Sequence, residues 1–378
     1  MKLSLFRTAN AIYSGRGSVQ GLGDIAKELG TNRVAIICDR NFHELGGYKP
    51  VADALTASGL VYAVFPDAVS EPSVKTVTDL AVKLADEKFD TLVGIGGGSA
   101  MDTTKLVSVL TCSKKPLMDM VGTNLVDCRG GVVILVPTTA GTGSEVTPNG
   151  ILTLEDEGRK AGVVSPFLLP DAAILDPELS VSLPKALTAS TGMDGLIHSL
   201  ESYIGKKANT LGDAVALQGI TLIAANVRQA YRDGSDLDAR ENMLHGSMLG
   251  GMALTAAGTA AVHALAYPIG GKFAVPHGVA NSMLLLPVLK NTRPACEERL
   301  AKVAQAMGLP ANADALEQEI ANLCEELEIP NNLGEFGCGE SDLDDLAISA
   351  SKVTRLLDNN PQPLGIPEIR AIYASLLH

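Results

Sequence analysis

Residues 90–105 read DTLVGIGGGSAMDTTK, and this stretch predicts the architecture of the first half of the protein. Its opening apolar run is typical of a buried strand, and SAMDTTK has the composition of a helix start. Glycines between a strand and a helix let the backbone approach an anion, and the helix N-terminus offers it free N–H groups. The stretch indicates a phosphate-binding turn; the alternative is a tight turn that needs glycine only for its backbone angles.

Two other loops follow strand patterns and carry polar side chains suited to a nucleotide. Asp39 closes the run RVAIICD (33–39), where a carboxylate accepts hydrogen bonds from a ribose and repels a 2′-phosphate. The standard dinucleotide fingerprint puts this acid about 20 residues after the glycines, whereas here it precedes them, so a solvated strand end is the alternative. The hydroxyl-rich loop PTTAGTGSEVT (137–147) contacts a nucleotide or is a surface turn.

Strand and helix patterns alternate up to about residue 178. Short apolar runs at 33–39, 60–65, 90–98 and 131–137 alternate with helical patterns such as 73–89 and 99–110. This alternation predicts an α/β fold with a parallel sheet. Later segments are long and helical, without clear strand runs. We therefore expect an α/β nucleotide-binding domain over 1–178 and an all-α domain over 179–378.

The amino-acid composition argues against some classes of binding partner and indicates the cellular compartment. The net charge of −13 argues against nucleic acid and anionic membrane surfaces. The six cysteines show no CxxC pair, which predicts free thiols in a reducing cytoplasm, and the first residues lack the apolar core of a signal peptide. Residues 246–271 carry no charged side chain other than histidine, but their Ala, Gly, Thr and Ser content favours a buried helix over a membrane span.

Four side chains in the second half suit a metal. Asp194 and His198 stand four apart in a helical pattern, so they share one face. His263 and His277 enclose HALAYPIGGKFAVPH, in which Pro268 and the paired glycines predict a helix break that returns His277 toward the metal. One carboxylate with three imidazoles suits Fe²⁺ or Zn²⁺. The alternatives are a helix-face pair and two hydrogen-bonded core histidines.

Taken in order, four motifs resemble the iron-containing (group III) alcohol dehydrogenases. They are GGGSAMDTTK (96–105), PTTAGTGSEVT (137–147), TGMDGLIHSLESY (191–203) and VHALAYPIGGKFAVPHGVANSMLLLP (262–287). The resemblance covers essentially the whole chain. It implies an N-terminal nucleotide domain and a C-terminal helical domain of dehydroquinate synthase-like architecture, with the active site in the cleft between them, and a homodimer or larger homo-oligomer.

The resemblance also implies roles for single residues. The metal ligands would be Asp194, His198, His263 and His277; the NAD contacts would be Asp39, Gly97, Gly98, Ser99, Asp102, Thr138, Thr139, Thr142 and Lys160. The chain departs from the family pattern at Glu71, where an Asn-Pro-Thr turn is common, and at Tyr267, where many members carry histidine. Tyr267 is therefore the candidate for moving the alcohol proton, with packing as its alternative role.

The expected activity is metal-dependent hydride transfer between NAD(H) and a small alcohol with its aldehyde or ketone. A hydroxyacid–oxoacid transhydrogenase with the same site is the second candidate. A lyase resembling dehydroquinate synthase is the third, and it is disfavoured because few basic residues lie near the ligand positions.

Overall fold

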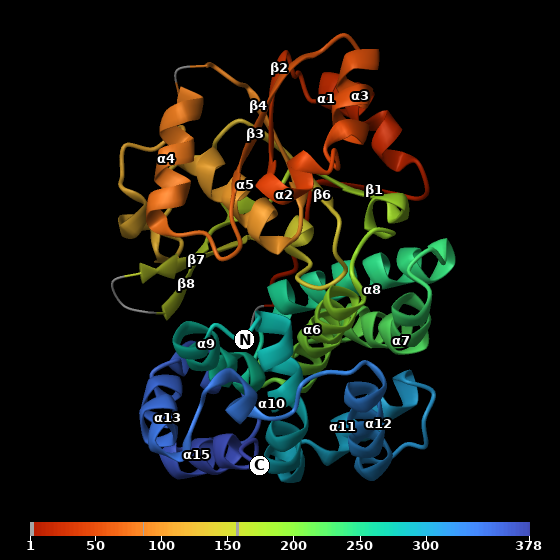
Figure 1. The fold of residues 1–378 in the computed structure, drawn as a ribbon, viewed down its shortest axis with the longest axis vertical. Coiled ribbons are helices and arrows are strands. Elements are labelled where there is room, and N and C mark those ends of the chain that lie inside the picture. The colour runs from red at the N-terminus through yellow and green to blue at the C-terminus, as the bar shows by residue number, and fades with distance from the viewer. Residues whose placement is uncertain (1–3, 86, 156–158) are drawn as a thin grey trace. The chain divides into compact units, whose positions relative to one another are not determined.

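A computed structural model describes residues 4–85, 87–155 and 159–378 (Figure 1). The chain divides into two compact units. The sheet unit holds Thr8–Thr139 and Ser144–Ser182; the helical unit holds Leu183–His378, Ala140–Gly143 and the described residues before Thr8. The expected domain division after residue 178 stays a prediction, because compactness alone does not show where an independently folding domain ends.

The sheet unit contains a six-stranded sheet in which every pair of neighbouring strands is parallel. The predicted parallel α/β fold is therefore confirmed. The strand order is β1-β9-β6-β4-β2-β3. The strands are β1 (Ala11–Ser14), β2 (Arg33–Asp39), β3 (Val61–Ala68), β4 (Thr91–Gly96), β6 (Val132–Pro137) and β9 (Ala172–Leu175).

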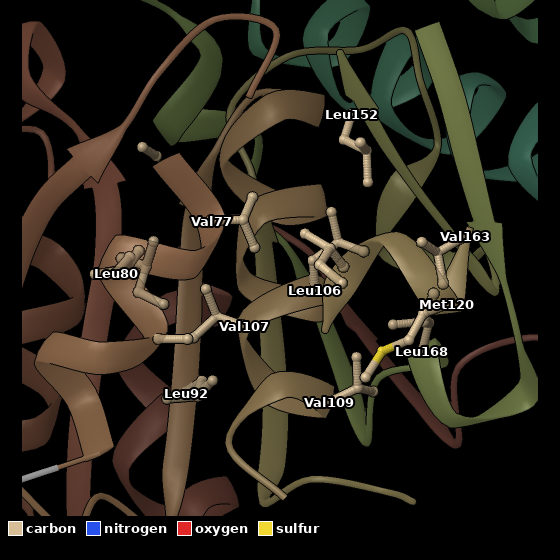
Figure 2. Packing of buried hydrophobic residues seen from close by; sticks show 14 of the residues in the cluster. Val77, Leu80, Leu92, Leu106, Val107, Val109, Met120, Leu152, Val163 and Leu168 are labelled. Carbon is tan, nitrogen blue, oxygen red and sulfur yellow. The ribbon is translucent and has the colours of Figure 1, made fainter. Parts of the chain in front are cut away.

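Helices cover both faces of this sheet, because successive strand side chains point to opposite faces. They are α1 (Leu22–Glu28), α2 (Arg40–Glu44), α3 (Lys49–Ala57), α4 (Val74–Ala85) and α5 (Gly98–Leu110). On one face, Val34 and Ile36 of β2 pack in a core with α1 and α3. On the other face, Ala35 and Ile37 join a core with α4 and α5, and Figure 2 shows its central part.

A second, three-stranded sheet lies in the same unit and was not anticipated from the sequence. Its strands are β5 (Gly122–Thr123), β7 (Asn149–Leu154) and β8 (Arg159–Val164), in the order β5-β8-β7. Leu152 and Val163 of this sheet pack in the same core as Leu106 of α5 (Figure 2). The packing holds the small sheet against the helix that follows the glycine turn.

The prediction that all six cysteines are free thiols is wrong for two of them. Cys112 and Cys128 form a disulfide across 16 positions, with Cα atoms 6.2 Å apart. Cys112 follows α5, and the chain returns past that end of the helix to begin β6 at Val132. This reversal brings the two sulfur atoms together, and the spacing of the cysteines in the sequence does not predict the disulfide. The other four thiols are free: Cys38, Cys296, Cys324 and Cys338.

The helical unit contains no strand among its described residues, as the sequence predicted. Its helices are α6 (Lys185–Ile204), α7 (Thr210–Arg232), α8 (Leu237–Ala257), α9 (Ala261–Phe273), α10 (His277–Thr292), α11 (Glu297–Ala306), α12 (Ala313–Glu326), α13 (Leu343–Ser351), α14 (Thr354–Leu357) and α15 (Ile366–Ala374). α6 is buried along almost its whole length between its neighbours. It therefore presents side chains to the interior on every face.

The predicted helix break at PIGGKF is wrong. α9 continues through Pro268 and both glycines to Phe273, and the chain reverses at Ala274, which has a left-handed backbone (φ 53°). A proline disturbs the hydrogen bonds of the preceding turn. Here the carbonyl of Leu265 in that turn accepts a hydrogen bond from the Tyr373 hydroxyl at 2.7 Å. This hydrogen bond ties the far end of the chain to α9 one residue after Ala264, whose carbonyl loses its helical partner at Pro268.

One described helix, α7, has the length and apolar composition of a membrane span, which a core helix of a globular protein can also have. Its apolar stripe packs against α6 and α8, while Arg228 at its other face pairs with Glu319 and Glu326. The uncharged stretch 246–271 falls on α8 and α9, which meet at a bend of 106°. It does not form one straight span.

Candidate metal centre and nucleotide loops

Three imidazole nitrogens surround one carboxylate oxygen in the helical unit. Oδ1 of Asp194 lies 4.0 Å from Nε2 of His198, 3.8 Å from Nε2 of His263 and 3.9 Å from Nε2 of His277. Asp194, His263 and His277 form the group whose atoms lie close enough together to share an ion. The ring of His198 stacks on His263 with centroids 4.7 Å apart. The structure thus brings together the four residues that the sequence singled out.

The elements around these side chains orient the nitrogens toward a common point. Asp194 and His198 lie on the buried helix α6, His263 in the first turn of α9 and His277 at the first position of α10. Nδ1 of His198 lies 3.2 Å from the carbonyl oxygen of Gly141, an acceptor, so this nitrogen carries the proton. The lone pair of the ring is then on Nε2, which faces Asp194.

The donor set fits a divalent cation. Nε2 of His263 is buried and has no hydrogen-bond partner among the described residues, which is costly for a polar atom unless a ligand satisfies it. Four N and O donors of this kind suit Fe²⁺ or Zn²⁺.

Burial and neighbouring charges set the protonation of the cluster. Burial raises the pKa of Asp194, but the three imidazoles and a hydrogen bond from Asn281 outweigh it and hold this pKa at about 2. Burial lowers the pKa of His198, which keeps that ring neutral and able to bind a metal. Burial also acts to lower the pKa of His263, but the hydrogen bond and charge of Glu201 raise it.

Two residues of this site were missed in reading the sequence. Glu201 bonds His263, and the Nδ2 atom of Asn281 donates to Oδ1 of Asp194 at 2.7 Å. Glu201 stands seven positions after Asp194 on α6, and Asn281 stands four after His277 on α10. Both spacings keep a side chain on the ligand face of its helix, so extending the i, i+4 search by one turn would have found them.

The candidate nucleotide loops of the sheet unit lie at the ends of neighbouring strands. Asp39 ends β2, Gly97 follows β4, and Thr138 follows β6, where its N–H bonds the Gly96 carbonyl at 3.0 Å. In the sheet, β4 lies between β2 and β6, and the strand order reverses between β2 and β4. Nucleotides bind at such a reversal, outside the carboxyl ends of parallel strands. The acid that seemed misplaced along the chain therefore lies beside the glycine turn.

The glycine turn has the geometry expected of an anion-binding helix start. Gly96 has φ +145°, a conformation that favours glycine, and a Cβ there would lie 2.9 Å from that of Ala100. No side chain caps the N-terminus of α5, so Gly98 and Ser99 present the first N–H groups of the helix. Asp39, by contrast, caps α2 by accepting from the N–H of Phe42 at 2.9 Å.

Lys160 reaches the same region from the small sheet. Its Nζ lies 2.7 Å from Oε1 of Glu71, and the N–H of Glu71 donates to Oγ of Ser99 at 3.2 Å. Glu71 holds a left-handed backbone (φ 56°) in the loop after β3. The glutamate that departs from the resembled pattern thus joins the glycine turn to the lysine.

Asp102 is occupied inside the sheet unit. Its Oδ1 accepts from Oγ of Ser144, its Oδ2 accepts from the N–H of Ile151 at 3.0 Å, and Nζ of the fully buried Lys105 lies 3.1 Å from Oδ1. Lys105 also donates to the carbonyl of Ser144 at 2.9 Å. Asp102 and Lys105 therefore tie α5 to residues of the hydroxyl-rich loop.

The raised pKa of Glu145, in that loop, leads us to expect that the stability of the protein depends on pH. Burial raises its pKa to about 7, against an opposing effect from Lys105. Between pH 4.5 and 7 the folded state binds more protons than the unfolded state, so stability falls as the pH rises through this range. The shift corresponds to about 3 kcal/mol. Glu145→Gln should raise the thermal midpoint at pH 8 and change it little at pH 5.

The matched control for Glu145 is Glu87→Gln, a half-exposed glutamate of the same unit that pairs with Arg33. It should shift the midpoint by less than about a degree, because exposed ion pairs contribute little. A gain from Glu145→Gln that is equal at both pH values would show that the titration of this carboxyl is not its cause.

The remaining candidate, Tyr267, lies one turn after His263 on α9. Its ring centroid is 6.1 Å from that of His277, and it is half-buried.

A candidate site for a divalent cation and a candidate nucleotide-binding edge of a parallel sheet thus occur in one chain, a combination typical of metal- and nucleotide-dependent enzymes. Residues 9–177 match the iron-containing alcohol dehydrogenase family, and residues 188–377 match the C-terminal region of the same family. The chain belongs to the iron-containing alcohol dehydrogenases, as its motifs predicted, and is an NAD-dependent enzyme of this kind.

Individual relatives agree with this assignment over nearly their whole length. Long-chain-alcohol dehydrogenase 1 of Geobacillus thermodenitrificans is 40% identical over 96% of this chain and 93% of its own. A crystal structure of a 1,3-propanediol oxidoreductase superposes with a TM-score of 0.95 at 34% identity and covers 100% of both chains. The NAD⁺ complex of a sulfoacetaldehyde reductase from Bifidobacterium kashiwanohense has a TM-score of 0.92 at 29% identity, over 100% of this chain and 99% of its own.

Proposed function

We propose that this enzyme interconverts a small alcohol and its aldehyde or ketone with NAD(H), on Fe²⁺ held by Asp194, His198, His263 and His277. The supporting observation is the convergence of three imidazole Nε2 atoms, at 3.8–4.0 Å, on one buried carboxylate oxygen. Zn²⁺ suits the same ligands.

A divalent ion in this site supplies Lewis-acid polarisation of the alcohol or carbonyl oxygen. The protein contributes fixed donors: a hydrogen bond from Asn281 favours the ionised form of Asp194, and burial lowers the pKa of His198, which favours its neutral, metal-binding form. Asp194 and His263 are nearly inaccessible to solvent, which strengthens the electrostatic interactions in the site. Tyr267 is the group proposed to take the alcohol proton away from the site.

For the cofactor, we propose that the N-terminus of α5 at Gly97, Gly98 and Ser99 binds the pyrophosphate of NAD. Asp39 would bind the adenosine ribose, and Lys160, released from Glu71, would bind the second ribose. Thr138, Thr139 and Thr142 would add hydroxyl contacts. Asp102 would act indirectly, since its oxygens already hold α5 to Ser144 and Ile151.

Metal removal tests the proposed function. The protein is stripped with a chelator, divided, and reloaded with Fe²⁺ without oxygen, Zn²⁺ or Mg²⁺, while NADH oxidation is followed with a panel of small aldehydes. We expect activity to disappear on stripping and to return with Fe²⁺ or Zn²⁺ but not Mg²⁺, which prefers oxygen ligands. Full activity of the stripped protein would overturn the proposal.

Tyr267→Phe tests the proton step. We expect kcat to fall about 10²-fold, within the range for loss of a positioned proton carrier, with unchanged metal content and an altered pH profile. Tyr231→Phe serves as the matched control, because Tyr231 lies on α7 beneath Lys185 and not among the metal ligands. An unchanged rate and pH profile for Tyr267→Phe would leave this residue a packing role.

The four proposed metal ligands do not indicate which alcohol or aldehyde is the substrate. The relatives include enzymes named for long-chain alcohols, sulfoacetaldehyde and 1,3-propanediol, which differ in length and charge. Following the resemblance, we propose a homodimer or larger homo-oligomer. We also propose a cytoplasmic location, supported by the four cysteines that remain free thiols.

A further inference from the structure

Glu201 is a buried carboxylate that touches a metal ligand and is not itself placed to bind the metal. It lies on α6, three positions after His198, and its side chain is 1% exposed. It accepts three hydrogen bonds: Oε2 from the N–H of Ala260 at 2.9 Å, Oε1 from the N–H of Val262 at 2.6 Å, and Oε2 from Nδ1 of His263 at 2.6 Å. One side chain of α6 therefore holds both the start of α9 and the ring of His263.

The third hydrogen bond decides the state of the His263 ring. The other two partners of this carboxylate are backbone N–H groups, which can only donate, so both of its oxygens act as acceptors. We therefore infer that the carboxylate also accepts a hydrogen bond from Nδ1 of the ring. The proton of a neutral His263 then lies on Nδ1, and the lone pair lies on Nε2. That Nε2 atom is the buried, unpartnered nitrogen 3.8 Å from Asp194.

The charges of the site also favour a bound divalent cation. Asp194 and Glu201 are both buried, and neither forms an ion pair with a lysine or arginine among the described residues. Two buried negative charges without a fixed cation are costly. A divalent ion held by the four proposed ligands would balance both charges.

We propose that Glu201 is a positioning residue that sets the metal affinity of this site. It holds His263 with its Nε2 lone pair toward the ion, and it supplies the second of the two carboxylate charges that compensate a divalent cation. This inference rests on the proposed function, because it needs the four ligands to bind a metal. It goes further in assigning to a residue outside the ligand set a share of the affinity.

The test compares Glu201→Gln with the wild-type protein in metal binding, apart from activity. Gln keeps the size of the side chain but loses the charge, and its NH₂ group would face either Nδ1 of His263 or a backbone N–H. Stripped protein is titrated with Zn²⁺ and with Co²⁺ against a competing chelator, and the Co²⁺ absorption spectrum is recorded. We expect the affinity of Glu201→Gln to fall 10- to 100-fold, with an altered Co²⁺ spectrum.

A structural control separates positioning from simple helix capping. Asn359 is 1% exposed, and its Nδ2 donates to the carbonyls of Ala257 and Thr259, in the same connection between α8 and α9. It has no hydrogen bond to a ligand histidine in the described chain. Asn359→Ala should lower the thermal midpoint of the stripped protein but should change the metal affinity by less than about threefold.

The outcomes separate cleanly. A metal affinity of Glu201→Gln within twofold of wild type, or a loss no larger than that of Asn359→Ala, would overturn the inference and leave the proposed function standing. A wild-type protein that binds neither Zn²⁺ nor Co²⁺ would overturn the proposed function as well. If Glu201→Gln does not fold, Glu201→Asp replaces it; the shorter carboxylate keeps the charge but loses reach, and we expect a smaller loss of affinity with folding retained.

Discussion

Asp194→Asn should abolish metal binding and reduce alcohol oxidation about 10³-fold. The asparagine keeps the shape of the side chain, and its oxygen still accepts from Asn281, so the fold is preserved. It removes the negative charge on which the three histidine nitrogens converge. A metal that polarises a reacting oxygen contributes several kcal/mol, and each 1.36 kcal/mol is tenfold in rate. The measurements are metal content after dialysis, and kcat.

The control for this variant is Asp213→Asn, which removes a carboxylate of the same unit that pairs with Arg299 on the outside of α7. It should keep its metal and its rate. NADH binding, followed by fluorescence, should be unchanged in both variants, because the proposed nucleotide loops lie mainly in the sheet unit. Stoichiometric metal in Asp194→Asn would show that this carboxylate is not a ligand.

Gly278→Ala should destabilise the protein by about 3 kcal/mol and weaken metal binding at the same time. Gly278 follows His277 in the first turn of α10, and a Cβ there would lie 2.3 Å from the carbonyl oxygen of Ser190 on α6. Because that atom belongs to the backbone of a buried helix, α10 has to move, and overpacking of this kind is costly. His277 moves with it. Thermal unfolding and chelator competition measure the two effects.

Gly270→Ala is the matched control, within α9. A Cβ at this position meets only the Val275 carbonyl oxygen at 3.5 Å, an ordinary contact distance. Because alanine favours a helix over glycine by roughly 1 kcal/mol, we expect unchanged or slightly increased stability and unchanged metal affinity. Equal losses in the two variants would contradict the close-approach argument for Gly278.

Most of the metal site was predictable because its residues form recognisable local sequence patterns. Asp194 and His198 share a helix face at i, i+4, and histidine is rare in this chain, with six in 378 residues. Spacing alone did not show whether His263 and His277 lie near this pair, and the family resemblance supplied that prediction. Glu201 and Asn281 lie seven and four positions after a proposed ligand on the same helix, but such spacings fit many roles, and only their hydrogen bonds in the structure show which ligand each one holds.

The sequence by itself determined the strand–helix alternation of the parallel sheet, the helical character of the chain after residue 178, and the glycine turn between β4 and α5. These depend on local periodicity and on backbone preferences of single residues. Only the tertiary structure decided the strand order that sets Asp39 beside the glycine turn, the disulfide between Cys112 and Cys128, and the continuation of α9 through Pro268 with Tyr373 as partner. Each joins residues far apart in the chain, and such contacts depend on how elements pack, which no local pattern encodes.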